Sequence, residues 1–165
     1  MQSDGTRRSP DAQLAAMRRV WPDFTGKKLS DGTLWWQGPL RPKARLHIVS
    51  LFWKPGVMSL PYVMVTDPPI EPRPGGKFAE IPHLIFHSEE PTRSGLCLFD
   101  PEGREWSPAK LIAETTIYWT AEWLAYYEIW HLNGEWLAPG VGYESVARMH
   151  AADARIVREV LADVH

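Results

Sequence analysis

The sequence predicts one α+β domain, in which an N-terminal helix is followed by an antiparallel meander of three or four strands and then by C-terminal helices. Three observations carry this prediction. Apolar residues recur at helical spacing near the start of the chain, alternating apolar stretches separated by turn signals fill its first half, and helical spacing returns in its second half. The 165 residues suffice for one domain with a sizeable core.

The N-terminal helix is predicted to begin at Pro10. Residues 1–9 are polar and are expected to form a flexible tail, ahead of a single domain over residues 10–165. Ser9 can cap the helix and Pro10 suits its first position. Apolar residues follow at helical spacing, and Pro22 is expected to end the helix.

The strands are predicted from short apolar stretches that lie between turns. They are expected at residues 34–38, 44–53 and 61–66, and the apolar piece 83–86 can add a fourth. The second stretch alternates through Leu46, Ile48, Ser50 and Phe52. This period of two is typical of a strand.

A proline-rich segment, residues 67–76, follows the third predicted strand. It carries four prolines from Pro68 to Pro74 and two glycines, so it can be neither a helix nor a central strand. We expect a loop, which either shapes the edge of a functional site or serves only as a rigid connector.

Helical spacing returns after Ser107. Ser107 can act as a cap and Pro108 suits the first turn, so residues 109–132 are predicted to form one bent helix or two, ended by Gly134. Their apolar positions make a wide face. A last helix is predicted over residues 143–163.

The composition argues against several classes of function. The net charge of −2 gives no electrostatic reason to expect nucleic acid or an anionic membrane as partner. A single cysteine excludes an internal disulfide and a multi-cysteine zinc site, and we expect neither a metal nor a cofactor. The first residues lack the apolar core of a signal peptide and no stretch resembles a membrane span, so a cytoplasmic protein is expected. Most of the nine tryptophans are expected in the core, and a surplus could serve an interaction surface.

The only cysteine, Cys97, lies in an irregular polar stretch, residues 87–108, that glycine and proline punctuate. A lone cysteine is often a small buried apolar residue, and Leu96 and Leu98 on either side are consistent with that role. Gly95 would let the backbone approach another group closely. Loops fixed on a scaffold often carry chemistry, so the alternative role for the thiol is that of a nucleophile that forms a thioester.

Three motifs in this stretch resemble the core of ubiquitin-conjugating enzymes, the carriers that hold a ubiquitin-like protein as a thioester. The family's pattern is His-Pro-Asn, then Gly-x-(Ile/Leu)-Cys-Leu, then Trp-Ser-Pro-Ala. This chain has His87, Gly-Leu-Cys-Leu at residues 95–98 and Trp-Ser-Pro-Ala at residues 106–109, at nearly the family's spacing. The resemblance extends over roughly residues 10–132 and implies a ubiquitin-conjugating-enzyme-like fold, with Cys97 as the residue that accepts the acyl group.

The chain departs from the family's pattern at the asparagine. His-Ser-Glu stands at residues 87–89, and the carboxylate of Glu89 cannot donate a hydrogen bond to an oxyanion unless it is protonated. His83 is a second candidate for the site histidine, because bacterial relatives often show Pro-His at this place. The choice between His87 and His83, as the group that organises the site or assists proton transfer, stays open. Glu89 or Asp100 could orient or deprotonate an incoming amine.

The helical region is similar to the prokaryotic branch of this family, whose members show a Trp-x-x-Glu-Trp-Leu-x-x-Tyr-Glu-x-Trp pattern. Here that pattern runs from Trp119 to Trp130. Members of this branch are associated with antiphage signalling (CBASS) operons. The resemblance implies a stand-alone carrier that attaches the C terminus of a bacterial nucleotide cyclase to target amines, and whether an adenylating enzyme acts in trans stays open. Bacterial operons that conjugate a ubiquitin-like protein are a second context.

Two other functions stay open. The chain could be a non-catalytic scaffold that binds a cyclase or a ubiquitin-like partner through its Trp-rich helices, or a Cys-His hydrolase that releases an acyl group to water. The intact Cys97 favours the carrier over the scaffold, whereas the missing asparagine of the His-Pro-Asn motif favours the scaffold. No cysteine at a helix start with an orienting partner supports the hydrolase. Residues 133–165 could dock the partner, replace the family's C-terminal helices or form a homodimer contact.

Overall fold

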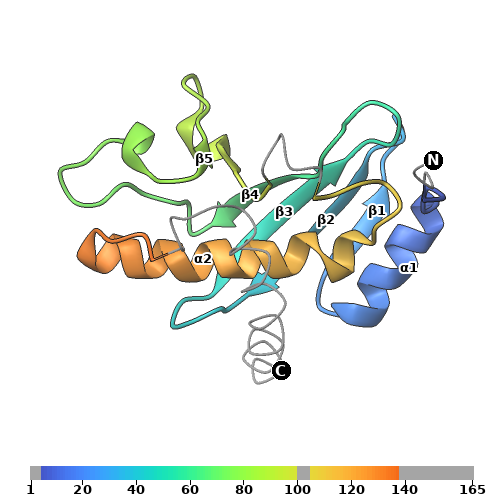
Figure 1. The fold of residues 1–165 in the computed structure, drawn as a ribbon, viewed down its shortest axis with the longest axis horizontal. Coiled ribbons are helices and arrows are strands. Elements are labelled where there is room, and N and C mark those ends of the chain that lie inside the picture. The colour runs from blue at the N-terminus through green and yellow to red at the C-terminus, as the bar shows by residue number, and fades with distance from the viewer. Residues whose placement is uncertain (1–4, 100–104, 138–165) are drawn as a thin grey trace.

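The computed structural model describes residues 5–99 and 105–137 of the chain, and it has the predicted α+β layout. An N-terminal helix precedes a four-stranded antiparallel sheet, a two-stranded hairpin and a long helix. Figure 1 shows the long helix, α2 (Thr116–Asn133), lying along one face of the sheet, with α1 (Pro10–Val20) beside the end at which α2 begins. The last predicted helix, over residues 143–163, lies outside the described residues.

Helix α1 begins and ends where the local signals predict. The Ser9 hydroxyl accepts a 3.1 Å hydrogen bond from the N–H of Ala12, and Pro10 occupies the first helical position. Trp21 caps the C-terminal end, directly before Pro22. Of the segment expected to be a flexible tail, Arg8 is hydrogen-bonded to the backbone carbonyls of Pro108 and Ala109.

The sheet is an antiparallel meander of β1 (Thr25–Lys28), β2 (Leu34–Leu40), β3 (His47–Trp53) and β4 (Tyr62–Asp67), paired in that order. Strand β1 was not predicted, because its sequence, TGKK, shows no apolar alternation, and it forms by pairing with β2. Every second residue of β2 is buried, as one face of the strand packs on the core.

Strand β3 differs from its prediction in its start and in its most buried face. The alternation through Leu46, Ile48, Ser50 and Phe52 does not mark the core face, because the alternate row is the fully buried one, with His47, Val49, Leu51 and Trp53 all at most 1% exposed. The strand begins at His47 rather than at Ala44, because the backbone N–H groups of Ala44 and Arg45 bond to the Glu128 carboxylate on α2, at 3.1 and 3.0 Å.

Helix α2 begins at Thr116, seven residues after residue 109, where the helical region was predicted to start, and is preceded by a 3-10 turn, η3 (Ile112–Glu114). Side chains of the N-terminal region bind the intervening backbone. The Gln13 amide donates to the carbonyl of Lys110 and accepts from the N–H of Ile112, both at 2.9 Å, and the Trp21 indole donates to the carbonyl of Ala113 at 2.8 Å. The N–H of Ile112 is therefore not available for a helical bond. The helix ends as predicted, at Gly134, which has a left-handed φ of 82°.

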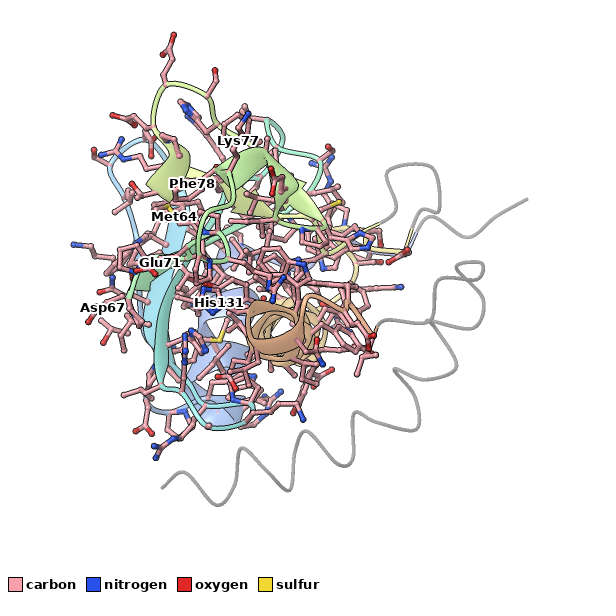
Figure 2. The ribbon with its side chains drawn as sticks, turned by 90° about the vertical axis from the view of Figure 1, so that its left-hand side faces the viewer. Met64, Asp67, Glu71, Lys77, Phe78 and His131 are labelled. Carbon is pink, nitrogen blue, oxygen red and sulfur yellow. The ribbon has the colours of Figure 1, made fainter. Side chains whose placement is uncertain are left out.

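The proline-rich loop after β4 is packed against the C-terminal half of α2. The Tyr127 hydroxyl accepts from the N–H of Glu71 at 2.8 Å and donates to its carbonyl at 3.2 Å. His131 contacts the carbonyl of Pro72 at 3.2 Å, and Figure 2 shows Glu71 and His131 near each other where the loop meets the helix. Burial raises the pKa of the Tyr127 phenol, a shift that the bond from Glu71 partly opposes. The loop is thus fixed to the helix by hydrogen bonds of its backbone.

Candidate functional site

Cys97 follows directly after strand β6 (Gly95–Leu96), which pairs with β5 (Leu84–Ile85) in a short antiparallel hairpin. The thiol residue is half-buried, whereas its neighbour Leu96 is only 3% exposed and belongs to the core. The Cys97 N–H donates to the carbonyl of His83 at 3.0 Å, and its Sγ lies 3.8 Å from the carbonyl oxygen of Phe99. The cysteine therefore lies at the end of a strand, with its backbone N–H hydrogen-bonded and the residue only half-buried.

The hairpin register distinguishes the two candidate histidines. Leu84 pairs with Leu96, and the bond from Cys97 to His83 extends the same ladder by one position. His83 thus lies opposite Cys97, and its side chain is exposed. His87 lies in the loop that closes the far end of the hairpin. The structure brings His83, and not His87, beside the cysteine.

His87 organises its own loop. Its backbone N–H donates to the Ser94 hydroxyl at 2.9 Å, and its Nδ1 accepts from the N–H of Glu90 at 3.0 Å. Glu89, the third residue of the His-Ser-Glu motif, is exposed in this loop, which leads into the 3-10 turn η2 (Pro91–Arg93). Asp100, the remaining predicted site residue, lies outside the described residues. The geometry gives His87 a structural use that does not involve the thiol.

Gly95 allows the backbone to approach another group closely, as the sequence predicts. A Cβ at this position would lie 2.5 Å from Cε2 of Tyr62, a distance at which the two groups overlap. The Tyr62 ring is in turn fixed by its hydroxyl, which donates to the carbonyl of Arg93 at 2.6 Å. Burial raises the pKa of this phenol, so it remains a donor across the physiological range. Tyr62 and Gly95 together seat the cysteine-bearing strand against β4.

One side of α2 packs against the cysteine segment with aromatic residues. Trp119 makes an edge contact with Phe99, the rings being 5.0 Å apart. The Trp123 indole donates a 2.9 Å hydrogen bond to the carbonyl of His83, the same oxygen that Cys97 contacts. Trp136, which follows α2, lies 5.5 Å from the His83 ring and 5.2 Å from the Trp123 ring. The sequence presents Trp119 and Trp123 only as part of an apolar helix face, although their spacing of four places both on the same side.

Trp106, between the cysteine and α2, has the packing role expected of it. It is 5% exposed and its ring meets that of Trp53 edge-on at 5.4 Å. Of the Trp-Ser-Pro-Ala run, Trp106 therefore belongs to the core, whereas the three residues after it are half-buried, and the Ser-Pro pair forms a turn rather than the first turn of a helix.

In the parts of the chain that the structure describes, no group of three or more His, Cys, Asp or Glu side chains is placed to hold a metal ion. No helix among those same residues is long and apolar enough to cross a membrane.

The arrangement combines a partly open thiol, an exposed imidazole on the neighbouring strand and a rigid aromatic support. A thiol so placed can serve as a nucleophile toward an acyl group, and an imidazole can carry the proton of a second nucleophile. Comparison with known proteins gives a matching family model, described as type II CBASS E2 protein, over residues 13–143. No curated protein matches the chain.

Proposed function

The chain belongs to the family of type II CBASS E2 proteins, and from this premise we propose that it is an acyl carrier whose thiol, Cys97, holds the C terminus of a partner protein. The observation that carries the proposal is the position of Cys97, half-buried at the end of β6 and hydrogen-bonded to the residue opposite. A purely structural thiol would be expected to be buried like its neighbour Leu96.

The proposed reaction has two acyl transfers. In the first, the Cys97 thiolate attacks the activated carboxyl carbon of the partner, a C–S bond forms, and the bond to the activating group, an adenylate supplied by a separate enzyme, breaks. In the second, an amine nitrogen attacks the thioester carbon, a C–N bond forms, and the C–S bond breaks to return the thiolate. The nitrogen loses a proton to a base during this step.

We assign the proton-carrying or orienting role to His83 rather than to His87. His83 lies opposite Cys97 in the hairpin ladder and its side chain is exposed. The Nδ1 of His87 is already engaged by Glu90 in the hairpin loop. Glu89 and Asp100 are kept as groups that could orient the amine, without a contact to support either.

The partner is proposed to be the C terminus of a bacterial nucleotide cyclase, because the family name connects the chain with CBASS. A ubiquitin-like protein is the alternative cargo, and the chemistry at the thiol would be the same. We propose that the protein acts in antiviral defence in the cytoplasm.

The test is coexpression of the chain with the neighbouring genes of its operon, followed by a non-reducing gel and intact mass. Wild type is expected to carry an adduct that a thiol reductant removes, Cys97→Ser an ester that resists it, and Cys97→Ala none. The mass difference identifies the cargo. If a partner co-purifies but none of the three forms carries an adduct, the scaffold alternative holds and the carrier function is wrong. Turnover to a free carboxyl with no amide product would point to the hydrolase instead.

A further inference from the structure

The carbonyl oxygen of His83 is the point at which helix α2 meets the cysteine-bearing strand. It accepts hydrogen bonds from the Cys97 N–H at 3.0 Å and from the Trp123 indole N–H at 2.9 Å. His83 also has a φ of 51°, the left-handed region, and it is the only described residue other than glycine with a positive φ. Such a conformation is unfavourable for a side-chain-bearing residue and persists only where its surroundings hold it.

We propose that Trp123 is a positioning residue for the thiol, acting through the backbone of His83. This inference rests on the proposed function of Cys97, and it names the residue that fixes the position of the thiol. In the proposal, Trp123 acts on the thiol through this backbone carbonyl and makes no contact with the acyl group. Its indole N–H holds the His83 carbonyl in the orientation that receives Cys97.

The Trp123 donor is itself rigid, which is what the role requires. The ring is 4% exposed, stacks on Tyr127 at 5.5 Å with an angle of 14°, and meets Trp136 edge-on at 5.2 Å. Tyr127 is tied in turn to the backbone of Glu71 by two hydrogen bonds. Because these neighbours fix the plane of the indole, its N–H has a single direction, and that direction is toward His83.

A second contact from the same helix keeps the far side of the cysteine in place. Trp119 meets Phe99, two residues after Cys97, with ring centroids 5.0 Å apart. The thiol residue is therefore held between two attachments, one through the His83 carbonyl and one through the Phe99 ring. Loss of the first attachment would let His83 relax to a negative φ, turn its carbonyl away from the Cys97 N–H and release one side of the thiol. Small misplacements of a reacting group cost large factors in rate.

The variant that tests this is Trp123→Phe, which keeps an aromatic ring in the core but has no N–H donor. In the proposal its effect depends on the strain at His83, so the same change is made in a His83→Gly background, where a positive φ costs glycine little. The matched control is Trp130→Phe, the same substitution on the same helix. Trp130 is 7% exposed, and its indole nitrogen makes no hydrogen bond to any residue that the structure describes.

Two measurements are made on each purified full-length variant. One is the single-turnover rate constant for adduct formation at saturating donor, with the half-saturating donor concentration. The other is the hydrogen-exchange rate of the Cys97 amide, which needs no partner. Trp123→Phe is expected to lower the rate constant by about 10- to 100-fold, with less than a threefold change in the half-saturating donor concentration. It should also speed hydrogen exchange of the Cys97 amide by at least about 10-fold, because the loss of one hydrogen bond corresponds to about one factor of ten. In the His83→Gly background both effects should shrink to less than about threefold, and Trp130→Phe should leave both readouts within about twofold of wild type.

Equal effects of Trp123→Phe in the wild-type and His83→Gly backgrounds would overturn the proposal, because the indole would then act as ordinary packing. Unchanged exchange of the Cys97 amide would overturn it as well. Absence of any adduct on wild type would refute the proposed function but not the positioning, which the exchange measurement still decides. If circular dichroism shows that Trp123→Phe does not fold, Trp123→Leu, which also lacks a hydrogen-bond donor, takes its place in the same comparison, with Trp130→Leu as its control.

Discussion

Replacing Gly95 by alanine is expected to strain the strand that leads to Cys97. The new Cβ would lie 2.5 Å from Cε2, 2.7 Å from Cζ and 3.0 Å from the hydroxyl oxygen of Tyr62, whereas non-bonded carbon atoms rest about 3.5–4.0 Å apart. The ring must therefore move by about 1 Å. Its movement endangers the 2.6 Å bond from its hydroxyl to the carbonyl of Arg93. Over-packing costs about 1–3 kcal/mol and the lost bond adds about 1, so the free energy of unfolding should fall by about 2–4 kcal/mol.

The assay for Gly95→Ala is thermal and urea unfolding, with Tyr62→Leu and the double variant beside it. For a domain of this size the midpoint of thermal unfolding should drop by about 4–16 °C. Tyr62→Leu removes the ring that the new methyl group meets, so the double variant should be more stable than the sum of the two single losses by about 1 kcal/mol or more. Additive losses, or a Gly95→Ala protein within about 0.5 kcal/mol of wild type, would show that this contact does not constrain the strand.

Three further predictions concern the helix junction, an alkaline titration and the site histidine. Gln13→Met leaves the carbonyl of Lys110 and the N–H of Ile112 without their 2.9 Å hydrogen-bond partners. Urea unfolding should therefore show that the free energy of unfolding falls by about 2–4 kcal/mol. The control Arg18→Met, at an exposed position of the same helix, should lower it by less than about 0.5 kcal/mol. Burial raises the pKa of Tyr127 above that of the unfolded chain. Its contribution to stability is therefore intact below the unfolded pKa of about 10 and is lost as the pH rises from there through the folded value. The difference in stability between wild type and Tyr127→Phe should accordingly narrow above about pH 10 rather than stay constant. His83→Asn, which tolerates a left-handed backbone, should slow amine transfer by about 100-fold with the adduct still formed, whereas His87→Asn should slow it less than about threefold, and equal effects of the two would refute the assignment of His83.

The parts of the fold that the sequence predicts are those set by local chemistry. Ser9 and Pro10, which are adjacent in the chain, specify the start of α1, and Gly134 supplies the left-handed residue that ends α2. Three of the four meander strands, β2, β3 and β4, follow from apolar stretches between turns, whereas β1 does not, and the apolar piece at residues 83–86 contributes β5 to the separate hairpin instead of a fourth meander strand. Gly95 was expected to allow a close approach, and the Tyr62 ring is the group that makes it.

The parts that the sequence does not predict are set by partners distant in the chain. The Ser-Pro pair at residues 107–108 is a sound local helix signal, yet Gln13, about a hundred residues earlier, takes the N–H of Ile112 that such a helix would use. Likewise the chain before β3 looks extended from Ala44, but the Glu128 carboxylate binds its backbone. No spacing rule brings these groups together, because their meeting is a result of the packing of α1 and α2 on the sheet.

The candidate site shows the same division. Cys97 is prominent as the single thiol in a recognisable motif, but His83 and His87 are both plausible neighbours in sequence. The register of the β5–β6 hairpin distinguishes their positions, because the hydrogen bond from the Cys97 N–H to the His83 carbonyl places His83 opposite Cys97. Trp123 is hidden from sequence reasoning for another reason: an apolar helix residue gives no sign that its one polar atom is aimed at the backbone of the site.

The measurement that tests the central claim most directly is a single-turnover chase of the charged carrier. The adduct is isolated under non-reducing conditions, its attachment point is mapped by tandem mass spectrometry, and a lysine-containing acceptor or neutral hydroxylamine is then added. The account predicts attachment at Cys97, rapid loss of the adduct on addition of either amine, and appearance of the cargo as an amide or hydroxamate with recovery of the unmodified thiol. An adduct mapped to a residue other than Cys97, or one on Cys97 that neither amine discharges, would contradict it.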